Sequence, residues 1–418
     1  MLLNPVLHTP FAGPQPQTSH QRISVDPDPF QSLYDSLANL TLTPNATYPQ
    51  PQQAPPESIQ IDENESLPTS PVTDLTPIPA SILFPPGDNV IFAHSSFFTS
   101  PLSRGVELPT PSHIRADLIT RAFTSGIFPT SLPLETAQTS ELIPFPSLGL
   151  LVKYGGEDIV SSTEGKTLMM IKRLLEDRVP VPEVFGWRRD AEAKERVLYM
   201  SLPQGRTLHN RWGELTLQEK DGVCESVRRF VREWRRLSQA PGRAVVGSID
   251  NTPLRDEVFK FSDSEKNGLT IPAPGPFGTV GNFHSYFVAT AVALSQNRGN
   301  KSQGTRGEVN YQPHHLFPDN VPLAFTHGAL HPRNIIVAEG ANPRVVAIIG
   351  WEQAGWYPAY WELCKAKLEC SRYGGGLDEW ETRYLPGILS LDGYGLESQG
   401  WNGRALVQYW DYFVGLMH

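Results

Sequence analysis

Cysteine is scarce in this sequence of 418 residues. The three cysteines, Cys224, Cys364 and Cys370, form an odd and sparse set that does not fit a disulfide framework. Cys364 and Cys370 have no further cysteine or histidine nearby that could complete the four ligands of a structural zinc site. The sequence therefore predicts neither a disulfide scaffold nor a cysteine-bound metal.

Long apolar runs and basic clusters are missing as well. No uninterrupted apolar stretch reaches the roughly 18 residues that a membrane-spanning helix needs. The N-terminus lacks a positively charged segment followed by an apolar one, which a secretory signal peptide would have. Basic residues are not clustered among aromatic residues, so a nucleic-acid partner is not expected. We expect a soluble, cytoplasmic protein without a membrane or nucleic-acid partner.

Basic residues are almost absent from the first 86 residues. This segment contains one base, Arg22, against eight acidic residues, and it holds 17 of the 39 prolines. Eight acids and one base give −7 of the total formal charge of −9. Such a composition cannot bury enough apolar surface to offset the entropy lost on ordering. We therefore predict a disordered tail over residues 1–86.

The remaining residues are long enough for one large two-lobed domain. Branched and aromatic residues over 145–154 and 196–202 predict two strands. A helix is predicted between them, because Leu168, Ile171 and Leu175 recur at helical spacing. Further along, Thr216 and Glu219 have the spacing of a capping box, and the helix that they open has apolar positions at Val223, Val227, Val231, Trp234 and Leu237.

Lys153 is the first lysine of the chain and lies at the end of an apolar run. A buried ammonium group is unfavourable unless it meets an anion. Glu164 lies four residues before Leu168 and so falls on the buried face of the predicted helix, where it could pair with Lys153. Two alternatives remain open. Glu164 could form a capping box with Ser161, and Lys153 could point into water from an edge strand.

Residues 325–363 carry the most specific motif, and they read FTHGALHPRNIIVAEGANPRVVAIIGWEQAGWYPAYWEL. This segment resembles the phosphotransferase loops of the aminoglycoside phosphotransferase and choline kinase-like family, especially the branch common in filamentous fungi. Upstream, LGLLVKYG at residues 148–155 resembles the strand with the ATP-binding lysine, and TEGKTL at 163–168 resembles the helix whose glutamate pairs with it. LYMSLPQG at 198–205 is similar to the hinge between the lobes. The resemblance covers roughly residues 85–418.

The resemblance implies an α+β fold of the two-lobed, protein-kinase-like type. A small N-lobe with an antiparallel sheet is expected over residues 87–202, and a mainly helical C-lobe over 203–418. The resemblance assigns nucleotide binding to Lys153, Glu164 and the hinge residue Met200.

The motif departs from the family pattern at two positions. In such kinases the loop H-G-D-x-x-P-x-N supplies an aspartate that accepts the proton of the attacking hydroxyl and an asparagine that holds a metal ion. Ala329 stands where this aspartate belongs, although His327, Gly328, Pro332 and Asn334 match. A second, metal-binding aspartate normally follows a short apolar strand, and here Gly350 follows residues 345–349. Asn334 is then the residual metal ligand.

The two departures decide the functional hypotheses. Loss of a general base alone typically lowers the rate by about 10² to 10⁴, and loss of the metal carboxylate removes the clamp on the phosphates as well. Glu352 and His331 belong to the family pattern, so we interpret them as structural rather than compensating, and we interpret His327 as a buried, hydrogen-bonded scaffold residue.

Our first hypothesis is a catalytically impaired pseudokinase that binds a nucleotide or small molecule, or acts as a scaffold for a protein partner. ATP is its candidate cofactor, whereas the missing carboxylates argue against Mg²⁺. The alternative is an ATP-dependent O-phosphotransferase that acts on a hydroxylated small metabolite with a different base and metal set. A third reading is a decayed gene product without a function.

Overall fold

The computed structural model describes residues 75–78, 84–125, 140–240, 242, 244–266, 268–299, 317–373, 377–391 and 403–418. The chain divides into two compact units, Met1–Ser66 and Leu67–His418, and all described residues belong to the second. Most of the predicted tail therefore lies outside the described residues, and its disorder stays a prediction. No helix in the described part of the chain combines the length and apolar character needed to cross a membrane.

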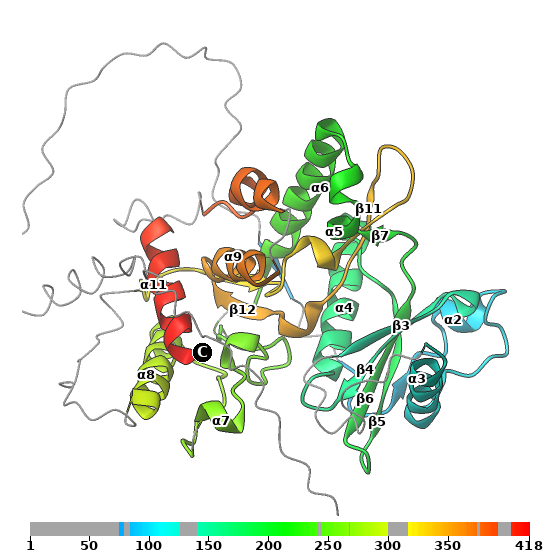
Figure 1. Ribbon diagram of the computed structural model, residues 1–418, viewed down its shortest axis with the longest axis horizontal. Helices are drawn as coiled ribbons and strands as arrows, with labels where there is room; N and C mark the ends of the chain where they lie inside the picture. The colour runs from blue at the N-terminus through cyan, green and yellow to red at the C-terminus, as the bar shows by residue number, and fades with distance from the viewer. Residues whose placement is uncertain are drawn as a thin grey trace, which may run out of the picture. The chain divides into compact units, whose positions relative to one another are not determined.

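The first half of the second unit is built around one antiparallel sheet (Figure 1). Its five strands follow the spatial order β2-β5-β6-β4-β3 and comprise Val90–Ile91 (β2), Glu141–Phe145 (β3), Leu150–Gly156 (β4), Val184–Asp190 (β5) and Glu195–Ser201 (β6). One face packs against helix α4, Ser162–Leu175, and the other against α2, Ser96–Thr99, and α3, Pro111–Ser125.

Side chains along β4 alternate between the two faces of the sheet, so each points either towards α4 or towards α2 and α3. Leu150, Val152 and Tyr154 belong to the apolar cluster on the α2 and α3 side, whereas Leu151 belongs to the cluster that contains α4. Successive strand residues point to opposite faces, so Lys153 shares the face of Leu151. The lysine is thereby directed towards α4 and the second lobe.

The second half is mainly helical. Its long helices are α6 (Leu217–Arg235), α8 (Val280–Gly299), α9 (Trp361–Tyr373) and α11 (Gly403–Met417). α8 and α11 lie side by side in Figure 1. Two small antiparallel sheets lie between the helices: β10 (Ile335–Val337) pairs with β11 (Val345–Ile348) and β7 (Arg206–Thr207), and β9 (Leu323–Thr326) pairs with β12 (Gly355–Pro358). The predicted two-lobed α+β fold, with an antiparallel sheet before a helical region, is confirmed.

The structure differs from the predictions at two places near the end of α6. Thr76–Pro77 forms strand β1, which pairs in parallel with β8, Leu237–Ser238, although both residues were assigned to the disordered tail. Leu237 was predicted within the helix, but α6 ends at Arg235. The backbone N–H of Thr76 donates to the carbonyl of Arg236 at 2.7 Å. Strand pairing with β1 therefore begins at the residue that follows the end of the helix.

Candidate functional site

Lys153 lies at the centre of the candidate site, and its side chain joins the two lobes. Its Nζ lies 2.7 Å from Oε2 of Glu164 on α4 and 2.9 Å from Oε2 of Glu352, which follows β11. Lys153 is only 4% exposed and Glu164 only 2%. The predicted pair of Lys153 and Glu164 is therefore present, and Lys153 does not point into water.

The protonation states of Lys153, Glu164 and Glu352 depend on one another. Burial acts to lower the pKa of Lys153, but attraction to Glu164 and Glu352 outweighs it and raises the pKa well above its usual range. Burial raises the pKa of Glu164, against the opposing effect of Lys153. For Glu352 burial also acts upward, but Lys153 outweighs it and lowers the pKa to about 2. Lys153 and Glu352 are therefore both charged at neutral pH.

Glu164 reaches the site because it does not cap its own helix. The side chain of Ser161 accepts a hydrogen bond from the N–H of Thr163 at 3.1 Å, which caps α4. Oε1 of Glu164 instead accepts from the backbone N–H of Trp351 at 3.2 Å. The predicted spacing of a capping box is thus realised at Thr216 and Glu219 but not here.

His327 is fixed as a neutral scaffold residue, as its position in the motif suggested. Its Nδ1 accepts from the N–H of Ala329 at 3.1 Å, so its Nε2 carries the proton and donates to the carbonyl of Ile349 at 3.0 Å. Burial lowers the pKa of His327 to about 4. A ring held in this way links the loop at 327–334 to the end of β11 and is not available as a base.

Ala329, Asn334 and Gly350 lie together, as the motif predicted. Ala329 is buried, with only 3% of the residue exposed. Nδ2 of Asn334 donates to the carbonyl of Ala329 at 2.8 Å. Gly350 has φ of 80°, and a Cβ atom there would lie 2.9 Å from Cγ of Asn334. The asparagine side chain therefore fills the space that a side chain at position 350 would need.

The sequence reasoning missed Glu362, at the start of α9. Its carboxylate accepts the backbone N–H groups of His327 at 2.6 Å and Gly328 at 3.0 Å, and the residue is fully buried. Burial raises its pKa to about 7, against the opposing effects of Arg235 and the two N–H donors. A single acid among apolar and aromatic residues was the available signal, because such an acid must find donors inside the fold.

A small buried apolar cluster adjoins the site on the second-lobe side. One face of the β10–β11 hairpin joins the main core, whereas Ile336, Ala347 and Ile349 form a separate small cluster on the other face. Met200 on β6 is only 3% exposed and pairs with Leu151 and Val184. The predicted role of Met200 in nucleotide binding stays a prediction.

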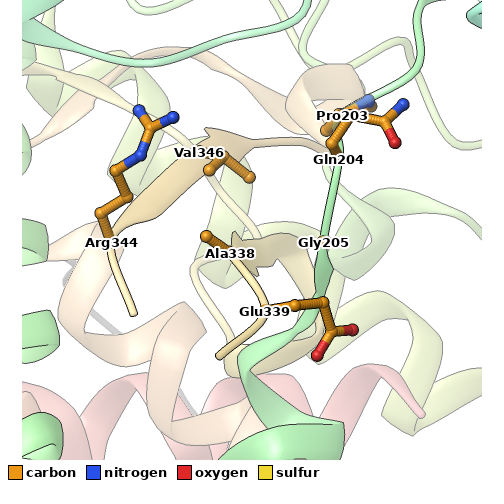
Figure 2. A pocket seen from close by; sticks show the side chains of 7 residues that line it. All are labelled: Pro203, Gln204, Gly205, Ala338, Glu339, Arg344 and Val346. Atoms are coloured by element: carbon orange, nitrogen blue, oxygen red, sulfur yellow. The ribbon is translucent and has the colours of Figure 1, made fainter. Parts of the chain in front are cut away.

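A hollow of about 550 Å³ lies between residues 203–205 and the β10–β11 turn (Figure 2). Figure 2 shows Arg344 on one side of it and Gln204 on the other, with Val346 and Ala338 between them.

A metal site of the family type does not fit these residues. The described residues contain no group of three His, Cys, Asp or Glu side chains that could hold a metal ion. Asn334, the residual ligand, would offer a metal ion one amide oxygen, Oδ1, since its Nδ2 donates to Ala329, and the carboxylate of Glu352 is engaged by Lys153. Mg²⁺ prefers several oxygen ligands, including carboxylates, and this part of the chain does not offer them around Asn334.

Comparisons with known proteins give a family match and similar structures. Residues 167–394 match the family described as "Phosphotransferase enzyme family" (APH). No curated protein sequence matches the chain. Among solved structures, the aminoglycoside-3'-phosphotransferase of type VIII is 16% identical, with 72% of this chain and 98% of that chain covered and a TM-score of 0.35. The aminoglycoside phosphotransferase APH(3'')-Id from Streptomyces rimosus is 12% identical, with 73% and 98% covered and a TM-score of 0.37.

Proposed function

Because the chain belongs to the phosphotransferase enzyme family, we propose that it is a member that binds a nucleotide or small molecule without transferring phosphate by the base-and-metal route. One observation carries the proposal. The places assigned to the two aspartates hold a buried methyl group, Ala329, and a glycine, Gly350, whose side-chain space is filled by Asn334. Catalysis of phosphoryl transfer consists almost entirely of positioning and charge stabilisation, so both losses act on the same step.

What remains at the site is suited to binding. Lys153 and Glu164 keep the ion pair that would orient a cation towards phosphate groups. The separate apolar cluster of Ile336, Ala347 and Ile349 offers a surface on which a flat base could pack. Phosphate groups would compete with Glu352 for Lys153, because the carboxylate lies only 2.9 Å from Nζ. We therefore propose weak binding of ATP that does not depend on Mg²⁺.

The test is a thermal-shift titration with ATP, with and without Mg²⁺, beside an assay for ATP turnover with amino alcohols, aminoglycosides and small hydroxylated metabolites. We expect no turnover above background and a small stabilisation that EDTA does not remove. Glu352→Gln should strengthen ATP binding, because it frees Lys153 from one carboxylate, and Lys153→Ala should abolish it. Strong stabilisation of the wild type that requires Mg²⁺ would contradict the proposal.

The second candidate is an ATP-dependent O-phosphotransferase of a hydroxylated small molecule, and family membership favours it. It would need a base and a metal set other than those of the motif. Phosphorylated product that accumulates with the wild type and disappears in Lys153→Ala would establish this function in place of the first.

A further inference from the structure

A second surface, formed by α4, α6, β11 and the segment before β5, carries none of the site residues. Two hollows of about 340 and 480 Å³ adjoin there and share Phe230. Their lining includes five bases, Lys172, Arg178, Arg229, Arg232 and Arg344, and one acid, Glu233. We call this surface the basic groove.

Three arginines of the groove are not neutralised by the described residues. In the described part of the chain, Arg229, Arg232 and Arg344 take part in no ion pair. The single acid is already engaged, because Glu233 lies 2.7 Å from Arg178 and 3.4 Å from Arg236. The lining thus carries three arginines without an acidic partner among the described residues, on a chain whose formal net charge is −9. The groove is therefore a local exception to an acidic protein.

The floor of the groove is apolar and includes a strand edge. Val181, Phe230 and Val346 line the groove beside the bases. β11 is the outer strand in the order β11-β10-β7, and Val345 and Val346 line the groove. Near the end of β11 the edge is closed, because the N–H of Ile348 donates to the carbonyl of Pro180 at 2.8 Å. The part of the edge next to Arg344 includes Val346, which is partly exposed, and Arg344 also borders the hollow of Figure 2.

We propose that the basic groove docks an extended acidic peptide segment of a protein partner. Carboxylates of such a peptide would meet the unpaired arginines, and its alternate apolar side chains would lie on Val181, Phe230 and Val346. An extended chain can also pair with an exposed strand edge. Nucleic acid and lipid head groups would use the positive charge alone and leave the apolar floor and the strand edge without a partner.

The probe is a short fluorescein-labelled peptide in which Glu alternates with Val, and its binding to the full-length protein is followed by anisotropy. We expect it to bind about tenfold more tightly than the same peptide with Gln in place of Glu, and to weaken as salt is added. The double variant Arg232→Glu, Arg344→Glu should weaken binding by about tenfold or more, whereas Arg104→Glu, an exposed arginine outside the groove, should leave it within about twofold.

Three results would overturn the proposal. The first is equal affinity for the Glu and Gln peptides. The second is an equal effect of the groove variant and the Arg104→Glu control. The third is tighter binding of phosphatidylserine vesicles or inorganic polyphosphate than of the Glu peptide, since this would make the groove a general polyanion site. None of these measurements depends on a nucleotide, so they are independent of the proposed function.

Discussion

At the scale of single residues, Gly350 combines a left-handed backbone with a close neighbour. Its φ is 80°, and a Cβ atom would lie 2.9 Å from Cγ of Asn334. Gly340 has a φ of 85° and nothing within 4 Å of such an atom, so it is a matched control for the backbone term alone. We predict that Gly340→Ala lowers the free energy of unfolding by about 1 kcal/mol and Gly350→Ala by about 2–3 kcal/mol, measured by urea denaturation.

The same contact bears on restoring the motif by Gly350→Asp together with Ala329→Asp. The aspartate at 350 would have to displace the side chain of Asn334, which is held by the carbonyl of Ala329. We therefore expect the restored protein to be less stable than the wild type and to gain no ATP turnover. If Gly350→Ala and Gly340→Ala lower the free energy of unfolding equally, the side chain of Asn334 can move aside without destabilising the protein. The restored motif would then be compatible with the fold.

His331 should make the protein sensitive to acid. It is 1% exposed, and burial, together with the charges of Arg333 and His209, lowers its pKa from 6.5 to about 4. Because the pKa is lower in the folded protein, the contribution of the neutral ring to the free energy of unfolding is complete above pH 6.5. It decreases as the pH falls below 6.5 and is lost once the pH has fallen through about 4. The loss amounts to about 3 kcal/mol.

The variant His331→Asn should remove this dependence, because an asparagine at the start of a helical turn can still accept from the N–H of Arg333. We compare the free energy of unfolding of both proteins between pH 7 and pH 4. Glu362, whose raised pKa gives the opposite slope between about 4.5 and 7, is present in both and cancels in the difference. Parallel curves for the two proteins would contradict the prediction.

Residue pairs close along a buried face were predictable, and contacts across loops were not. The pairing of Lys153 with Glu164 was implied by the family resemblance, and the position of Glu164 on the buried face of its helix supported it. The second partner of Lys153, Glu352, lies 199 positions away along the chain, and only the path of the loop after Gly350 brings it there. The packing of Asn334 over Gly350 could not be predicted from the sequence either, since it depends on a hydrogen bond from Asn334 to a backbone carbonyl.

At the scale of elements, two similar start signals gave different caps. Thr216 and Glu219 satisfy each other's backbone N–H groups, whereas Ser161 caps α4 alone. The spacing is the same in both, but Glu164 has a buried ammonium within reach and Glu219 lies at the surface. The spacing in the sequence predicts the start of a helix. Whether the acidic side chain caps that helix or binds another group depends on the residues packed around it.

The cap of α6 also fixes a neighbouring turn, because Oε1 of Glu219 accepts from the N–H of Asn342 at 2.9 Å. We predict that Thr216→Ala lowers the free energy of unfolding by about 1 kcal/mol. Glu219→Ala should lower it further, since it removes the cap and the bond to the β10–β11 turn together. Ser161→Ala, which removes one bond only, is the comparison, and urea denaturation measures all three. A Glu219→Ala loss no larger than that of Thr216→Ala would show that the bond to Asn342 contributes nothing.

At the scale of the whole molecule, the fold was predictable from the kinase-like motifs, but the start of the ordered chain was not. Composition placed the boundary at residue 86 because proline and acid dominate up to that point. β1 nevertheless pairs with β8, and Ile78 and Phe84 pack against the main core. A strand of two residues that gains its stability from pairing far along the chain leaves no periodic signal of its own.

Matched truncations test this start. We predict that deletion of residues 1–74 leaves the free energy of unfolding unchanged, whereas deletion of residues 1–86 lowers it by about 2–3 kcal/mol, because it removes β1 and two partly buried apolar side chains. Thermal and urea unfolding of both proteins provide the measurement. Limited proteolysis should likewise leave a core that begins at or before residue 75. Equal stability of the two truncated proteins would place the functional start of the domain after residue 86.

The contacts of Lys153 and Glu164 also hold the two lobes together. Lys153 is bonded to Glu352, and Glu164 to the backbone of Trp351, so β4 and α4 are both tied to the chain that follows β11. Any separation of the lobes must break an ion pair and leave a buried carboxylate without its donor, which makes opening rare. A ligand whose phosphate groups displace Glu352 from Lys153 would remove one of these two ties, so ligand binding and separation of the lobes would be coupled.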